Sequence, residues 1–152
     1  MASNKSRLFA RAQTALLCAF TALFFLDRTP VLASIQSPSI GTALCVAGLL
    51  LMIAAFVSLR AVIQIAPQPK PDGHLVTSGP YQWLRHPIYT GMLALFIGLF
   101  LRKPTAPIGI ASAAIIVFLI VKSRFEEQLL EQRYPEYRQY KTRSWGIIPG
   151  LR

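Results

Sequence analysis

Acidic residues are scarce in this sequence. Of its 152 residues, 6 are Asp or Glu and 16 are Lys or Arg, so charged residues make up only 14% of the chain. Soluble domains carry about 25% charged residues, and 53% of this chain is hydrophobic. The composition therefore argues against a soluble globule. Since the length suits about one domain, we expect a small protein that crosses a membrane several times.

Cysteine and histidine are rare as well, with two of each. Cys18 and Cys45 lie inside apolar runs, where thiols act as small apolar side chains, so a disulfide framework is not expected. Two histidines without a cysteine cluster do not make a metal site. The net charge of +10 would suit nucleic acid, but the basic residues flank apolar segments, as membrane topology requires. We therefore expect neither a metal nor a nucleic acid as partner.

Four apolar runs are present, at residues 8–26, 40–59, 87–101 and 105–121. The first is long for the core of a signal peptide and lacks a clear cleavage site, so a membrane helix is the better interpretation. The third is short and crosses the bilayer only if it starts at Pro87 or if the bilayer thins. We predict an all-α integral membrane protein, a single domain over residues 1–152 with about four transmembrane helices.

Small residues recur in the second run, with glycines at positions 41 and 48. They either permit close helix packing or reflect only the frequency of small residues in membrane helices. The fourth run continues without a helix breaker past Val121 to Tyr134, which precedes a proline. We therefore predict a helical extension into the aqueous phase, followed by a short amphipathic helix at 136–143.

The basic residues are distributed unevenly between the two sides that four spans define. With both termini inside, the outer side receives only Arg28, Arg102 and Lys103, and the other thirteen basic residues lie inside. This asymmetry follows the positive-inside rule. We predict cytoplasmic termini, a cytoplasmic C-terminal extension and, as location, a bacterial inner membrane.

The stretch from Gly79 to Gly91, at the start of the third run, carries the most chemistry. Pro87 suits the first position of a helix, which places His86 at the N-cap and Arg85 just before it. A helix N-terminus and a guanidinium fork both suit an anion. The alternative is that Arg85 and His86 only anchor the chain at lipid headgroups. The preceding segment 60–86, rich in proline and glycine, is expected to form a lid or a pocket wall.

Two neighbouring carboxylates, Glu126 and Glu127, follow the fourth run. The predicted topology places them on the same side of the membrane as Arg85 and His86, so the two groups can face each other. A site that has an arginine able to bind a carboxylate of the ligand, and two carboxylates of its own, suits a ligand of mixed charge. The alternative is a solvated helix end in which Lys122 pairs with Glu126 at helical spacing.

These segments resemble a known family. Segments 77–81 (TSGPY) and 85–91 (RHPIYTG) resemble the isoprenylcysteine carboxyl methyltransferases and the related phospholipid methyltransferases, which are S-adenosylmethionine-dependent membrane enzymes. The second block of the family is matched by Glu126-Glu127, Leu129-Leu130, Tyr134, Tyr137, Tyr140 and Ile148-Pro149. Both blocks in this order favour the functional interpretation, with site segments at 77–91 and 122–149. This chain is shorter than the eukaryotic carboxyl methyltransferases, which leaves a prenylated protein substrate in doubt.

The resemblance implies S-adenosylmethionine as cofactor and a lipid-borne or apolar small molecule as methyl acceptor. It implies that Arg85, His86 and Glu126 take part in catalysis. The implied cofactor-binding residues are Gly79, Tyr81, Arg85, His86, Tyr89, Gly91, Glu126 and Glu127. Two other classes stay open. A membrane NADPH-dependent reductase of the sterol-reductase type has a similar C-terminal core, and a non-enzymatic membrane protein would leave both blocks unexplained.

Overall fold

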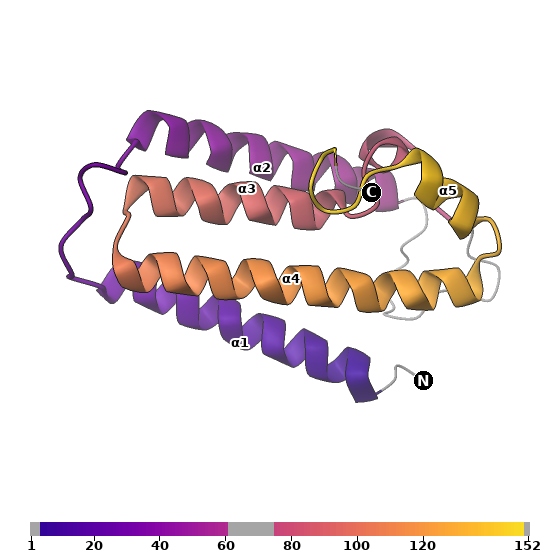
Figure 1. The fold of residues 1–152 in the computed structure, drawn as a ribbon, viewed down its shortest axis with the longest axis horizontal. Coiled ribbons are helices and arrows are strands. Elements are labelled where there is room, and N and C mark those ends of the chain that lie inside the picture. Colours follow the sequence, from indigo (N-terminus) through magenta and orange to yellow (C-terminus); the bar gives the residue numbers. More distant parts are fainter. Residues whose placement is uncertain (1–3, 61–74, 151–152) are drawn as a thin grey trace.

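The computed structural model describes residues 4–60 and 75–150 (Figure 1). Helices in these ranges are α1 (Asn4–Leu26), α2 (Pro38–Arg60), α3 (Pro87–Arg102), α4 (Ala106–Arg133) and α5 (Tyr137–Arg143), with a 3-10 turn, η1 (Gly79–Gln82). No strand occurs among these residues, so the all-α prediction is confirmed for them. The four long helices alternate in direction, and α1 begins at the end of the bundle that holds α5 (Figure 1). We call this the polar end.

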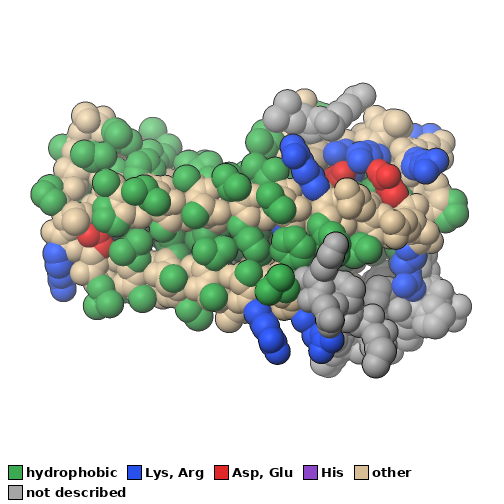
Figure 2. Space-filling view, turned by 60° about the horizontal axis from the view of Figure 1, so that its bottom comes forward, with side chains coloured by type: hydrophobic (Ala, Val, Ile, Leu, Met, Phe, Trp, Pro, Cys, Tyr) green, Lys and Arg blue, Asp and Glu red, His purple; other side chains and the backbone are tan. Residues whose placement is uncertain are grey.

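Three helices, α1, α2 and α4, are long and apolar enough to cross a membrane. The other apolar helix, α3, has 16 residues, so the third run is as short in the structure as in the sequence. Hydrophobic side chains cover most of the length of the helices, and most charged side chains gather at the polar end (Figure 2). This division suits a bundle whose apolar part lies in lipid.

Helix α4 is longer than its apolar run, as its sequence predicted. It begins after Thr105, whose side chain accepts a hydrogen bond from the backbone N–H of Ile108. It continues past Val121 to Arg133 and ends at Tyr134, because the following Pro135 disfavours helical geometry in the residue before it. The last three turns of α4 therefore carry charged residues beyond the apolar part, at the polar end.

Helices α2 and α3 make the most extensive contact in the bundle. A Cβ atom on Gly48 would lie 2.5 Å from the carbonyl oxygen of Gly91, and one on Gly91 would lie 2.6 Å from that of Gly48. Gly41 and Gly98 oppose each other in the same way. Only glycine permits so close an approach of two backbones. Close packing by the small residues of the second run is therefore confirmed.

Helix α1 packs on α4 and is anchored at the end opposite the polar end. Lys103 donates to the carbonyl oxygens of Phe24 and Asp27, both at 2.8 Å, and Thr105 donates to the Asp27 carboxylate at 2.5 Å. These bonds tie the end of α1 to the turn between α3 and α4. From this anchor, α1 and α4 diverge toward the polar end (Figure 1).

Candidate functional site

The start of α3 lies at the polar end. Pro87 is the first residue of the helix and His86 is its N-cap, with no hydrogen bond from the His86 side chain to the helix. The arrangement predicted from the sequence is thus confirmed. His86 and the preceding Arg85 are both buried, although each carries a polar side chain. Buried polar groups need partners, and those partners define the site.

Arg85 is held by two segments that lie far from it in sequence. Its Nε donates to Glu127 Oε1 at 2.8 Å, and one terminal nitrogen donates to the carbonyl oxygens of Ser144 at 2.6 Å and Lys141 at 3.2 Å. A guanidinium can serve these acceptors together because its N–H groups form a planar fork. Arg85 therefore joins α4 to the C-terminal segment.

Glu127 is the common partner of three basic side chains. Besides Arg85, it accepts from His86 Nε2 at 3.3 Å and pairs with Lys141 Nζ at 3.0 Å. Lys141 also bonds Glu131 at 2.9 Å, and hydrogen bonds to Glu131 and Glu127 raise the pKa of Lys141. Lys141 consequently stays charged at neutral pH, and Glu127 is committed to contacts within the protein.

Glu126 has a different environment from its neighbour. Both of its carboxylate oxygens accept from the Tyr89 hydroxyl, at 2.8 and 2.9 Å, and Lys122 Nζ lies 3.6 Å away. The Tyr89 ring stacks on His86 with centroids 5.5 Å apart. The Glu126 side chain is 35% exposed, against 13% for Glu127. Glu126 is therefore the carboxylate of the pair that a ligand can reach.

The segment 137–148, which we call the C-terminal strap, packs along the start of α3. The backbone N–H of Arg85 donates to the Trp145 carbonyl and that of Trp145 to the Trp83 carbonyl, both at 2.8 Å. The Thr90 hydroxyl donates to the Ile147 carbonyl at 2.6 Å, and Ile147 is buried in the apolar core. The strap thus closes one side of the site.

One tyrosine hydroxyl connects the strap to η1 and the residues that follow it. The Tyr140 hydroxyl donates to the Tyr81 carbonyl at 2.5 Å and to the Leu84 carbonyl at 3.2 Å. Burial raises the pKa of Tyr140 to about 12 and also raises the pKa values of Tyr81 and Tyr137. These phenols are therefore neutral at physiological pH, and the negative charge of the site belongs to the glutamates.

A cavity of about 280 Å³ lies among these elements. Its wall combines polar and apolar side chains from α2, η1, α3 and α4. The lining residues are Leu59, Tyr81, Arg85, His86, Ile88, Tyr89, Glu126 and Leu130. Rings, a carboxylate and an imidazole thus face an apolar wall, which suits a ligand with both an aromatic part and a charged part.

Five of the eight residues predicted from the sequence line this cavity. Glu127 does not line it but bonds two of the five, Arg85 and His86. The two predicted glycines do not line the cavity. Gly91 faces Gly48 of α2, and Gly79 adopts a φ of 60° against Ser58, where a Cβ would lie too close to the serine hydroxyl. Both glycines are required by packing and turn geometry, and the structure brings neither to the cavity wall.

Sequence reasoning missed three apolar lining residues. Leu130 lies four residues after Glu126, on the same side of a helix, and Ile88 lies between His86 and Tyr89, so both could have been inferred. Leu59 has no signal in the sequence, because only the packing of α2 on α3 brings it to the cavity. The expected lid at 60–86 lies in part, at 61–74, outside the described residues.

Comparison with known proteins gives a consistent result. The sequence profile of the phospholipid methyltransferase family matches residues 37–137. The human protein-S-isoprenylcysteine O-methyltransferase is 33% identical over 123 residues, which are 73% of this chain and 43% of the human protein. The enzyme of the same name from Dictyostelium discoideum is 32% identical over 90 residues, 57% of this chain and 38% of that protein.

A third relative carries a different description. The cobalt-zinc-cadmium resistance protein CzcN of Cupriavidus metallidurans is 32% identical over 83 residues, 54% of this chain and 38% of that protein. The chain thus spans about two fifths of the length of the curated relatives it matches. The family profile covers α2, α3 and α4 and therefore includes Arg85, His86, Glu126 and Glu127.

Proposed function

Because the chain belongs to the phospholipid methyltransferase family, an integral membrane family, we propose that it transfers a methyl group from S-adenosylmethionine to a lipid-borne or apolar acceptor. The observation that carries this proposal is the convergence of two distant sequence blocks. Arg85, His86 and Tyr89 meet Glu126 and Glu127 at one cavity.

The residues of the cavity fit the proposed cofactor. S-adenosylmethionine carries a carboxylate, an amino group, a sulfonium cation and an adenine ring. Glu126 offers negative charge for the amino group or the ribose hydroxyls, and the second terminal nitrogen of Arg85 is the group we propose for the carboxylate. Leu59, Ile88 and Leu130 offer apolar surface for the adenine ring. When bound, the cofactor supplies an electrophilic methyl group.

The protein contributes mainly position and exclusion of water. Methyl transfer is an in-line displacement, in which orientation of the reactants accounts for much of the rate. The strap and the α2–α3 contact hold the lining residues in place, and the apolar part of the wall keeps water out. A carboxylate or thiolate acceptor needs no strong base. An amine acceptor must lose a proton, and Glu126 is the carboxylate placed to accept it.

The proposal is tested by binding. Isothermal titration of the detergent-purified protein with S-adenosylmethionine should show saturable binding at one site, whereas NADPH should bind far more weakly. The reason is that the cavity offers one carboxylate and aromatic rings for a cation, not a cluster of basic groups for a phosphate. Binding of NADPH in preference to S-adenosylmethionine would overturn the methyltransferase proposal and favour the reductase alternative.

The membrane orientation is a second proposal, with both termini on the cytoplasmic side of a bacterial inner membrane. Lys122, Lys141 and Arg143 lie at the polar end, whereas Arg102 and Lys103 lie at the opposite end. Reporter fusions after Arg152 and within the turn at Lys103 should therefore give opposite signals, the first cytoplasmic. Equal signals from the two fusions would contradict the four-span topology, because α4 would then not cross the membrane.

A further inference from the structure

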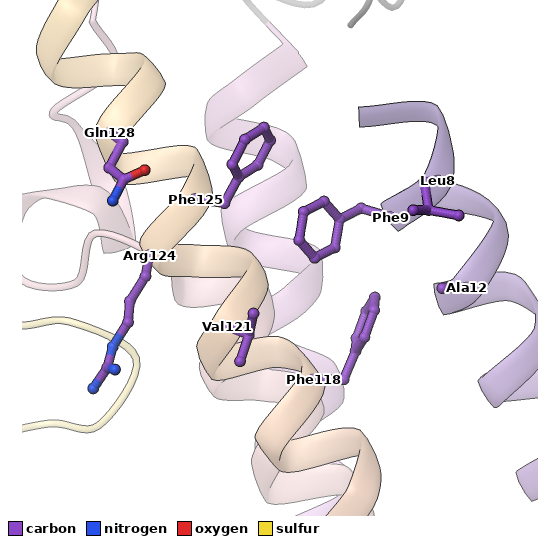
Figure 3. A pocket seen from close by; sticks show the side chains of 8 residues that line it. All are labelled: Leu8, Phe9, Ala12, Phe118, Val121, Arg124, Phe125 and Gln128. Atoms are coloured by element: carbon purple, nitrogen blue, oxygen red, sulfur yellow. The ribbon is translucent and has the colours of Figure 1, made fainter. Parts of the chain in front are cut away.

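A second cavity, of about 650 Å³, lies between α1 and α4 at the polar end (Figure 3). It forms where the two helices diverge from their anchor at Asp27. Its apolar lining comes from Leu8, Phe9 and Ala12 of α1 and from Phe118, Val121 and Phe125 of α4. The Phe9 ring lies 5.9 Å from that of Phe118 and 5.1 Å from that of Phe125, measured between centroids. These rings give the cavity a packed aromatic wall.

This cavity is separate from the proposed cofactor site. Arg124 and Gln128, one turn apart, border it, whereas Glu126 and Leu130 border the cofactor site. Residues two positions apart point to very different sides of a helix, so α4 stands between the two cavities. Lys122, which contacts Glu126, also donates to Gln13 of α1 at 2.6 Å. That bond and the aromatic wall close off the cofactor site.

The position of the cavity along the helices indicates what it holds. Val121 is the last residue of the apolar run of α4. Arg124 lies one turn beyond it, at the border of the cavity, and its side chain points away from α1 (Figure 3). On α1, Leu8 and Phe9 lie beside Arg11 at the same end. The cavity therefore spans the boundary between apolar and charged residues, which is the level of the lipid headgroups.

Arg124 carries a charge at this level and has no ionic partner among residues 4–60 and 75–150. It takes part in none of the ion pairs among the described residues. The acidic side chains of the same helix are engaged elsewhere, Glu126 by Lys122, Glu127 by Arg85 and Glu131 by Lys141. A basic group at the border of an apolar cavity at headgroup level complements one kind of molecule, an amphiphile with an anionic head.

We propose that this cavity binds an anionic phospholipid of the bilayer, with an acyl chain against Phe9, Phe118 and Phe125 and the phosphate on Arg124. The site is distinct from the cofactor cavity and does not depend on the proposed methyl transfer. Gln128 adds a hydrogen-bond donor beside Arg124 for the headgroup. The cavity lies within the size range of ligand pockets, about 300–1,000 Å³.

The test uses native mass spectrometry of the detergent-purified protein with phosphatidylglycerol and phosphatidylcholine that carry the same acyl chains. The wild-type protein should retain phosphatidylglycerol in preference. Arg124→Gln should lower retention of phosphatidylglycerol roughly fivefold, since one basic group near the membrane surface contributes about that factor, and should lower retention of phosphatidylcholine less, because the choline cation offsets the charge of its phosphate. Arg138→Gln, on exposed α5 outside the cavity, is the matched control and should change neither.

The apolar part of the site is tested by filling it. Ala12→Phe places a ring in the cavity and should lower retention of both lipids. Equal retention of the two lipids by the wild-type protein would overturn the proposal, as would unchanged retention by Ala12→Phe. Equal losses in Arg124→Gln and Arg138→Gln would also overturn it, because they would indicate diffuse attraction by a basic surface.

Discussion

In the Arg85→Ala variant, affinity for S-adenosylmethionine is expected to fall by roughly tenfold to a hundredfold, on the order of 1.5–3 kcal/mol. The substitution removes a charge-assisted contact to the ligand and also the bonds to Glu127, Ser144 and Lys141 that hold the strap. Titration calorimetry measures the first effect. Faster proteolysis within residues 137–148 measures the second, because a detached strap is accessible to protease.

Two variants distinguish these effects from a loss of charge alone. Arg85→Lys keeps a positive charge but lacks the fork, so it should recover part of the affinity and little of the protection of the strap. Arg138→Ala removes an exposed arginine of the same region and should match the wild-type protein in both measurements. Unchanged affinity in a well-folded Arg85→Ala protein would leave Arg85 only the structural role of joining α4 to the strap.

Glu126→Gln and Glu127→Gln make the same chemical change at neighbouring residues, and we expect opposite outcomes. Glu127→Gln leaves the buried Arg85, whose side chain is 4% exposed, without its counter-charge. The free energy of unfolding should fall by about 3 kcal/mol, which is the lower end of the range for breaking a buried ion pair. It should appear as a large drop in the unfolding temperature measured by the fluorescence of Trp83 and Trp145.

Glu126→Gln should leave the unfolding temperature nearly unchanged. Its pair with Lys122 is partly exposed and lies one helical turn away, and such pairs contribute roughly 0.3–0.5 kcal/mol. Its effect should instead appear as a loss of cofactor affinity of roughly tenfold, because a charged hydrogen-bond acceptor is removed from the cavity. If both glutamate variants lower stability and affinity equally, the division of roles between the two carboxylates is wrong.

A double-mutant cycle tests whether Arg85 and Glu126 act on one ligand. Combined in one protein and measured as cofactor affinity, Arg85→Ala and Glu126→Gln should show a coupling of about 0.5 kcal/mol or more. The two side chains do not bond each other in the structure, so the coupling would pass through the ligand or through Tyr89 and His86. Strictly additive losses would mean that the two residues contribute independently.

Patterns along the chain were sufficient for most of the helices. Apolar runs indicated α1 to α4, the uninterrupted stretch after Val121 indicated the extension of α4, and Tyr134 before Pro135 indicated its end. These features are set by local hydrophobicity and backbone geometry, which a sequence displays directly. The motif around Arg85 and the pair at Glu126 could be found for the same reason, since their residue types are distinctive.

The contacts between helices could not be obtained in this way. The two glycines at 79 and 91 were assigned to the cofactor, yet Gly91 serves the approach of α2 to α3 and Gly79 serves a turn against Ser58. A glycine has the same signature in both uses, because close approach to a helix and close approach to a ligand each require only the absence of a Cβ.

The different tasks of Glu126 and Glu127 also arise only in three dimensions. In the sequence they are adjacent and chemically identical, and both were assigned to the cofactor. Folding turns Glu127 toward Arg85 and the strap and turns Glu126 toward Tyr89 and the cavity, because adjacent residues of a helix point about 100° apart. Local order along the chain thus determines which groups are available, and the packing of α3, α4 and the strap determines which of them line the cavity.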